Sequence, residues 1–291
     1  ITACDSYTWN GSTYTTSGTY TYTSLNASGC VNTATLNLTI NSLPPVSLSA
    51  TLNPICSGTS TVITASGANT YLWMPGSLTG AVRTLTPTTS TTYTVTGTSS
   101  TGCTNTATIL ITVNAKPSFS IAANPATICN GSSTTLTASV STNTYVWMPG
   151  SLTGTSIVVS PSATTVYTAT ATNAAGCTKT ATKTVTVNAL PPVVASASAS
   201  TICGGSSTTL TGSGANTYSW MPGSLTGTSI TVSPAVTTTY TVTGTTTSTG
   251  CSKTSTVTIT VNSNTNDGNA TITACDSYTW NGSTYTTSGT Y

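Results

Sequence analysis

Charge is almost absent from this sequence. Only 3% of its 291 residues are charged, with five Lys or Arg, three Asp, and no His, Glu or Gln. The three acids are Asp5, Asp267 and Asp276, so residues 43–262 contain neither a carboxylate side chain nor an imidazole. General acid–base catalysis normally uses one of these groups, and histidine or carboxylate metal sites require them. We therefore expect no enzyme activity, no cofactor and no metal site.

Basic residues and long apolar runs are also scarce. Five basic side chains in 291 residues are too few to track a phosphate backbone, which argues against nucleic acid as a partner. No apolar run reaches the roughly 18 residues of a membrane-spanning helix, so no transmembrane segment is predicted. What remains is rich in Thr and Ser, with nine Cys. This composition indicates a structural or adhesive protein.

An internal repeat organises the chain. The segment Trp-Met-Pro-Gly-Ser-Leu-Thr-Gly begins at Trp73 and recurs at Trp147 and Trp220, each time between two cysteines. The predicted full repeats are 44–115, 116–189 and 190–262. A shorter unit precedes them at 1–43, with Trp9 and the same ending, and it looks like a full repeat that has lost its first strands.

The two ends of the sequence carry the same stretch of residues. Positions 1–20 and 272–291 are identical. This identity predicts a segment of a longer array in which the pattern starts again at position 272, so that 272–291 begins the next short repeat. Duplication of one terminal module is the alternative. Residues 263–271 are predicted to be a linker; Asp267 gives it a faint likeness to a calcium loop, but one carboxylate is too few for strong binding.

Periodicity predicts an all-β fold. Thr, Val, Ile and Tyr dominate, and runs such as 106–113 alternate apolar with polar residues, as half-buried strands do. Turn signals recur about every 8–12 residues, which favours a β-sandwich in each repeat. Prolines at the repeat boundaries fix φ and stiffen these joints, so we expect tandem immunoglobulin-like domains in an elongated rod or filament.

The cysteines are predicted to form one disulfide in each repeat. The spacing of the two cysteines is nearly the same in all three full repeats, and a bridge would staple a small core. The predicted pairs are Cys4–Cys30, Cys56–Cys103, Cys129–Cys177 and Cys203–Cys251. Cys275 would be unpaired within these residues, or would form an intermolecular bond. Disulfides at this density indicate an oxidising, extracellular location.

The recurring aromatic residues have a structural and a functional interpretation. One Trp in each unit, at the same position, favours core packing over a platform for stacking sugars. A Tyr in a late strand of each full repeat resembles the tyrosine corner of immunoglobulin domains. The predicted core aromatic residues are Trp9, Trp73, Trp147, Trp220, Tyr93, Tyr167 and Tyr240.

The stretch 1–20, together with Gly29-Cys30 and Thr33-Ala-Thr-Leu36, resembles the repeats of giant secreted surface proteins of Bacteroidetes. The Cys, WMPG, Tyr and Gly-Cys units resemble the immunoglobulin-like modules of the same proteins. The resemblance covers essentially the whole chain. It implies an exported adhesin, stalk or filament that serves attachment or gliding, and it brings no catalytic residues.

These observations favour a structural segment of an extracellular fibre or adhesin stalk, whose partners are copies of itself or the continuing chain. A second hypothesis is a non-covalently polymerising subunit in which a donated strand completes the short repeat. A third is a lectin-like module that binds surface glycans through its Trp and Tyr side chains.

Overall fold

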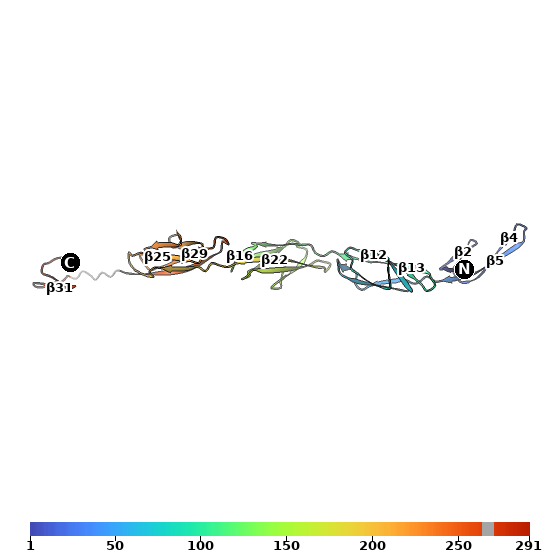
Figure 1. The fold of residues 1–291 in the computed structure, drawn as a ribbon, viewed down its shortest axis with the longest axis horizontal. Helices are drawn as coiled ribbons and strands as arrows, with labels where there is room; N and C mark the ends of the chain where they lie inside the picture. Colours follow the sequence, from blue (N-terminus) through green and yellow to red (C-terminus); the bar gives the residue numbers. More distant parts are fainter. Residues whose placement is uncertain (264–270) are drawn as a thin grey trace. The chain divides into compact units, whose positions relative to one another are not determined.

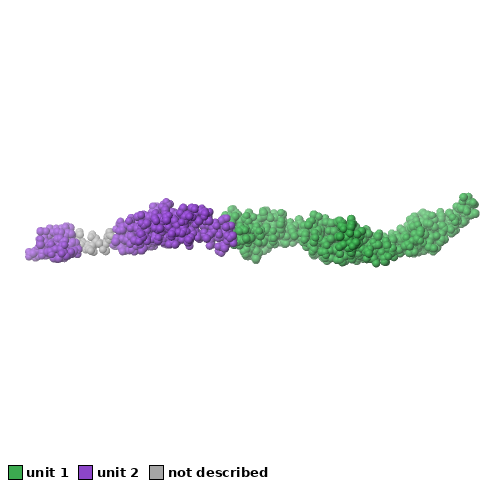
Figure 2. Space-filling view, in the orientation of Figure 1, with its two compact units in different colours: residues 1–126, 133–159, 165–185 green, residues 127–132, 160–164, 186–291 purple. Residues whose placement is uncertain are grey.

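The computed structural model describes residues 1–263 and 271–291. These residues form strands joined by turns, with no helix among them, and none of them belongs to a helix that could cross a membrane (Figure 1). They divide into two compact units (Figure 2). Unit 1 contains 1–126, 133–159 and 165–185; unit 2 contains 127–132, 160–164 and 186–291. The division does not follow the predicted repeat boundaries, because it cuts the second full repeat.

The first full repeat lies in unit 1 and has nine strands. They are β6 (Ser47–Ala50), β7 (Ile55–Cys56), β8 (Thr61–Ser66), β9 (Thr70–Met74), β10 (Leu78–Thr79), β11 (Val82–Leu85), β12 (Thr91–Thr98), β13 (Thr104–Ile111) and β14 (Val113–Asn114). One sheet has the order β11–β8–β6 and the other β10–β9–β12–β13, while β7 pairs in parallel with β14. The first strand is divided in two: β6 belongs to one sheet, and β7 runs parallel to β14 at the end of the last strand. This arrangement is that of an immunoglobulin-like β-sandwich.

Alternation along the strands builds the core of this sandwich. On β8, Thr61, Ile63 and Ala65 are buried, and the residues between them are more exposed. On β9 the buried residues are Tyr71 and Trp73. Successive side chains of a strand point to opposite faces, so this pattern places one face of each sheet against the other. The apolar core therefore lies between the two sheets.

The second full repeat has the same order of strands. They are β15 (Ile121–Asn124), β16 (Thr127–Cys129), β17 (Thr134–Ala138), β18 (Thr144–Met148), β19 (Leu152–Thr153), β20 (Ser156–Val159), β21 (Thr165–Thr172) and β22 (Thr178–Asn188). In unit 1, β17 lies between β15 and β20, and β21 pairs with β18 and with β22. In unit 2, β16 pairs in parallel with the last three residues of β22.

The third full repeat lies in unit 2. Its strands are β23 (Val194–Ala197), β24 (Thr201–Cys203), β25 (Thr208–Ser213), β26 (Thr217–Met221), β27 (Leu225–Thr226), β28 (Ser229–Val232), β29 (Thr238–Thr245) and β30 (Ser252–Asn262). The sheets have the orders β23–β25–β28 and β24–β30–β29–β26–β27. Leu210, Trp220, Val242 and Ile259 form the centre of its core and are fully buried.

The short repeat keeps only part of this architecture. Its sheet has the order β1–β5–β4, formed by β1 (Thr2–Cys4), β5 (Val31–Asn41) and β4 (Gly18–Leu25), beside a hairpin of β2 (Tyr7–Trp9) and β3 (Ser12–Tyr14). Strand β1 runs parallel to β5, as β7 does to β14. The short repeat therefore retains the strand that carries the first cysteine, and has the β2–β3 hairpin in place of a three-stranded sheet. A like hairpin, β31 (Tyr278–Trp280) with β32 (Ser283–Tyr285), lies near the C-terminus.

Candidate functional site: the disulfide joints between repeats

The first cysteine of every repeat occupies one position in the fold. It is the last residue of a short strand that pairs in parallel with the end of the repeat's last strand. Cys56 lies opposite Asn114 in this register, and the equivalent pairs are Cys4–Asn41, Cys129–Asn188 and Cys203–Asn262. Asn114 is also the residue at which the chain leaves the repeat. The first cysteine therefore lies at the end of the repeat from which the chain continues into the following repeat.

The second cysteine lies at the opposite end of the same last strand. Cys103 directly precedes β13, and Cys30, Cys177 and Cys251 directly precede β5, β22 and β30. The stretch from Cys103 to Asn114 is almost all in strand. A strand rises about 3.3 Å per residue, so the two ends of this stretch are about 36 Å apart.

The disulfide pairing predicted within each repeat is wrong for this reason. A disulfide requires Cα atoms roughly 4.4–6.8 Å apart, and the two cysteines of one repeat lie at opposite ends of it. The bonds instead join consecutive repeats. They are Cys4–Cys103, Cys56–Cys177 and Cys129–Cys251, each with a Cα–Cα distance of 5.6 Å. They replace the predicted pairs Cys4–Cys30, Cys56–Cys103, Cys129–Cys177 and Cys203–Cys251, and they leave Cys30, Cys203 and Cys275 as exposed free thiols.

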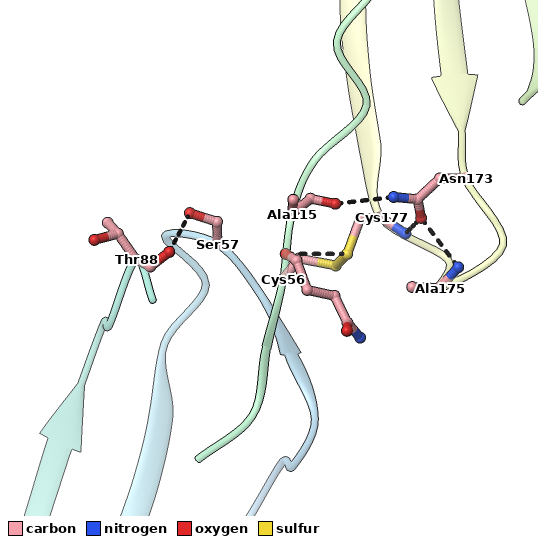
Figure 3. The surroundings of a disulfide bond; sticks show 8 residues. Cys56, Ser57, Thr88, Ala115, Asn173, Ala175 and Cys177 are labelled. Carbon is pink, nitrogen blue, oxygen red and sulfur yellow. Dashed lines mark hydrogen bonds between the residues drawn. A yellow bond between two sulfur atoms is a disulfide. The ribbon is translucent and has the colours of Figure 1, made fainter. Parts of the chain in front are cut away.

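The Cys56–Cys177 joint in unit 1 shows how polar contacts support the bond (Figure 3). The Asn173 side chain holds the turn before Cys177: its Oδ1 accepts hydrogen bonds from the backbone N–H of Ala175 and of Cys177, at 3.1 and 3.0 Å. Its Nδ2 donates to the carbonyl oxygen of Ala115, 2.8 Å away in the linker between the two repeats. The side-chain amide of Asn173 therefore stabilises the turn before Cys177 and also binds the linker between the two repeats.

Further contacts place the first cysteine of this joint. The Sγ of Cys177 lies 3.8 Å from the carbonyl oxygen of Asn114; this is a contact only, because a disulfide sulfur has no proton to donate. After Cys56, the Ser57 N–H donates to the same carbonyl group at 2.9 Å, and the Ser57 hydroxyl donates to the carbonyl oxygen of Thr88 at 3.2 Å (Figure 3). The disulfide therefore lies at a fixed point, beside the residue where the chain leaves the repeat.

The other two bonds share part of these contacts. At Cys4–Cys103, the Cys103 sulfur lies 3.9 Å from the carbonyl oxygen of Asn41, and the Asn105 Nδ2 donates to that of Pro44 at 3.0 Å. At Cys129–Cys251, the N–H of Asn130 donates to the carbonyl oxygen of Asn188 at 2.9 Å. Both cysteines of the Cys129–Cys251 bond lie in unit 2, which contains residues 127–132 and 186–188 together with the third repeat.

The three repeated tryptophans lie inside the sandwiches. Trp73, Trp147 and Trp220 are buried, and each indole N–H donates to the carbonyl oxygen of the glycine that ends its WMPGSLTG segment, at 2.7, 2.8 and 3.0 Å. Such side chains cannot stack on a sugar. Trp9 of the short repeat is half-buried, and its ring meets that of Tyr22 edge-on with centroids 6.1 Å apart.

The tyrosines of the late strands do not form a tyrosine corner. Tyr93 is half-buried and Tyr167 and Tyr240 are buried, but none of their hydroxyls makes a hydrogen bond to the residues described. The hydroxyl that binds a turn belongs to an earlier strand. Tyr71 donates to the carbonyl oxygen of Ala68 at 2.9 Å and accepts its N–H at 2.8 Å, and Tyr218 does the same with Ala215. The motif Asn-Thr-Tyr before each repeated Trp was the available sequence signal.

Among residues 1–263 and 271–291, no group of three or more His, Cys, Asp or Glu could hold a metal ion. The calcium-loop hypothesis at Asp267 falls outside the described residues. Burial raises the pKa of the Tyr167 phenol above its usual 10.0.

No family model matches the chain, and no curated protein matches it. Among solved structures, it resembles a Ca2+-stabilized adhesin that helps an Antarctic bacterium bind ice, at 15% identity, 85% coverage of this chain, 82% of that chain and a TM-score of 0.31. It also resembles the D1–D4 ectodomain fragment of ICAM-5, at 11% identity, 81% coverage of each chain and a TM-score of 0.40. These likenesses are too low to bear on function, and the fold assignment rests on the sheet topology.

Proposed function

We propose that this chain is a load-bearing segment of an extracellular bacterial fibre or adhesin stalk. The observation that carries the proposal is that every disulfide joins one repeat to the next. The bonds also interlock, because Cys56 lies inside the loop closed by Cys4–Cys103, and Cys129 lies inside the loop closed by Cys56–Cys177. No repeat can then be pulled open independently of its neighbours.

The interlocked bonds create a short covalent path along the chain. Tension entering at Cys4 crosses to Cys103, follows the chain to Cys129, and crosses to Cys251. This path contains 26 residue steps, whereas 247 separate Cys4 from Cys251 in the sequence. Fully extended, the chain spans at most about 3.5 Å per residue, so the path reaches about 90 Å plus two bridges, against about 860 Å without disulfides.

Most of this path is strand already. It follows β13 and β14, the linker to the second repeat, and then β15 and β16. A strand is already close to its fully extended length, so it lengthens little under tension. We infer that force passes through the covalent path and leaves the sandwich cores unloaded, which is the property required of a stalk.

The chemistry of the chain supports an extracellular position. Three disulfides require an oxidising compartment to form and persist. The nearly uncharged Thr- and Ser-rich surface binds water without ion pairs, so its solvation changes little with salt. A non-enzymatic role is part of the proposal, since the full repeats carry no carboxylate or imidazole for acid–base chemistry. The lectin-like alternative loses its three repeated Trp platforms to burial.

Single-molecule stretching of the full chain, held at both termini, tests the proposal. With disulfides intact, we expect no extension that corresponds to an unfolded repeat. With reductant, each full repeat should release more than about 200 Å, since each of its residues contributes about 3.5 Å when the chain is extended. Release of whole repeats with the bonds intact would overturn the proposal.

Two double variants serve as matched controls. Replacing Cys56 and Cys177 by Ser leaves the 26-step path unchanged, so the oxidised chain should extend no further than before. Replacing Cys129 and Cys251 by Ser makes the shortest path from Cys4 to Cys251 run through Cys103, Cys56 and Cys177, with 121 steps. That variant should extend about 330 Å further. Equal extension of the two variants would contradict the covalent path.

A further inference from the structure

Two of the free thiols, Cys203 and Cys30, occupy the two different positions that the bonded cysteines occupy in each joint. We propose that Cys203 forms a disulfide with the cysteine of a Gly29-Cys30-type hairpin, so that the third full repeat is bonded to a short repeat as the other repeats are bonded to one another. The partner group is in either case the thiol of such a hairpin. A second copy of this chain or a further short repeat of the same polypeptide can supply it.

Cys203 has the backbone setting of the cysteines that form bonds. It ends β24 opposite Asn262, in the register that Cys56 has with Asn114 and Cys129 with Asn188. The N–H that follows it, from Gly204, donates to the carbonyl oxygen of Asn262 at 3.0 Å. The N–H groups after the bonded first cysteines make the same contact at 2.9 to 3.0 Å. Cys203 is exposed and forms no disulfide within the chain.

Cys30 has the setting of the other half. Asn26 Oδ1 accepts hydrogen bonds from the N–H of Ser28 and of Cys30, both at 3.0 Å, as Asn173 Oδ1 does before Cys177. In the formed joint the Asn173 Nδ2 also donates to the carbonyl oxygen of Ala115. No described residue accepts a hydrogen bond from Asn26 Nδ2. By analogy, its acceptor is the carbonyl group that follows the last strand of a preceding repeat.

An independent feature indicates that the Cys30 hairpin binds another surface. Leu25 and Val31 flank it, pair across β4 and β5, and are 70% and 69% exposed. The residues at these two places in the bonded hairpins are Thr98 and Thr104, Thr172 and Thr178, and Thr245 and Ser252. Apolar side chains thus replace Thr and Ser beside the one second cysteine that lacks a partner. An apolar pair at the tip of a hairpin is stabilised by burial against another surface.

The third repeat offers an apolar residue at its matching end. Val236, in the loop between β28 and β29, is 71% exposed. The corresponding loop of the first repeat lies at the end that carries Cys56, because its Thr88 carbonyl accepts the Ser57 hydroxyl. Thr89 occupies the place of Val236 in that repeat. Both halves of the proposed joint therefore carry apolar groups that the first repeat's formed joint lacks.

The chemistry is a thiol–disulfide exchange that needs a disulfide donor, either a small molecule such as oxidised glutathione or a protein thiol oxidoreductase. The thiolate of one cysteine attacks the donor disulfide, forms a mixed disulfide and displaces the first donor thiolate. The second cysteine then attacks the protein sulfur of the mixed disulfide and displaces the other. In sum, two protein thiols lose two protons and two electrons, and the donor becomes two thiols.

Oxidation of the purified full chain tests the joint. With its free thiols kept reduced and then treated with oxidised glutathione, it should give a ladder at multiples of 29.1 kDa on a non-reducing gel, which collapses on reduction. Cys30→Ser and Cys203→Ser should each abolish the ladder, and a mixture of the two variants should stop at the dimer. Cys275→Ser is the matched control and should keep it.

Peptide mapping decides which sulfurs are joined. We expect Cys30–Cys203 to exceed every other new linkage by at least tenfold, and the Leu25→Thr/Val31→Thr variant, which keeps both thiols, to lower its yield several-fold. The second arm maps native material: a bond from Cys203 to a short-repeat cysteine in a species that stays far above 29.1 kDa after reduction assigns the hairpin to the same polypeptide. Absence of this linkage from both arms, or predominance of Cys203–Cys203, overturns the inference. The load path within one chain does not depend on it.

Discussion

Cys56 and Cys177 are bonded across 121 residues of sequence, with their Cα atoms 5.6 Å apart. Cys56 lies opposite Asn114, at the end where the chain leaves the first full repeat, and Cys177 directly precedes the last strand of the second. The bond therefore joins the end at which the chain leaves one repeat to the start of the last strand of the next repeat. Three such bonds turn a series of small sandwiches into a continuous cross-linked chain.

Removing this bond should weaken the joint without destroying either sandwich. In the Cys56→Ser/Cys177→Ser variant, each core keeps its buried Trp and apolar contacts, while the unfolded chain gains conformational freedom. Loop closure of this size corresponds to about 4–5 kcal/mol on a chain-entropy model. We expect a lower unfolding midpoint in denaturant and an unchanged far-ultraviolet spectrum. A loss of β-structure in the native variant would contradict independent cores.

Gly67 is predicted to be intolerant of any side chain. Its φ is +92°, and a Cβ built there would overlap the carbonyl oxygen of Pro45, at the start of the same repeat. Gly67→Ala should cost more than about 3 kcal/mol, since it combines the left-handed backbone penalty with a backbone clash. Gly58→Ala is the matched control, with φ +73° and open space around the new methyl group. It should cost about 1–2 kcal/mol. Equal losses in chemical denaturation would show that sterics at Pro45 do not matter.

The buried tryptophans should matter for stability and the exposed one should not. Trp147→Phe removes ring volume from a full core and leaves the Gly154 carbonyl oxygen without its 2.8 Å donor. We expect a loss of about 2–4 kcal/mol in unfolding free energy. Trp280, 46% exposed, should tolerate the same change within about 0.5 kcal/mol. If instead Trp147→Phe altered glycan binding and left stability unchanged, the lectin-like hypothesis would return.

The sequence alone revealed the repeats, the strand-rich sandwiches and the special positions of the cysteines and tryptophans. These are local signals: the regular return of the WMPGSLTG segment, alternation along a strand, and Pro-Gly or Gly-Cys turns. The disulfide partners were not local. Pairing within a repeat was predicted because two cysteines, 47 or 48 residues apart, recur on either side of each WMPGSLTG segment, but the parallel pairing of β7 with β14 carries Cys56 to the far end of the strand stretch that follows Cys103. Nothing in the alternation of either strand shows that long-range pairing.

The short repeat shows the same limit. Its resemblance to the end of a full repeat was visible in residues 29–41, and the missing sheet followed from its length. That Cys4 lies on a retained strand parallel to β5 required the structure.

Stability of the full repeats should be nearly independent of pH from about pH 3 to pH 8. They contain no carboxylate side chain and no His, so no paired carboxylate is lost on acidification. At alkaline pH, burial raises the pKa of Tyr167 above 10.0. The contribution of its neutral phenol is fully present below the unfolded-state pKa, and it is lost as the pH rises through the folded-state pKa, because the unfolded chain ionises first.

Denaturant titrations from pH 3 to pH 11, followed by Trp fluorescence, measure this dependence. Tyr167→Phe is the control, since phenylalanine cannot ionise and the variant should lose part of the alkaline decline. A stability maximum near pH 5, with a steep fall below it, would contradict the expectation.

The central claim is that the disulfides join different repeats, and a disulfide map of the unreduced protein tests it most directly. Digestion with pepsin at low pH prevents exchange, and mass spectrometry then identifies the linked peptides. The account predicts Cys4–Cys103, Cys56–Cys177 and Cys129–Cys251, with Cys275 free. Recovery of Cys56–Cys103 and Cys129–Cys177 would contradict it, because bonds within single repeats would not join one repeat to the next.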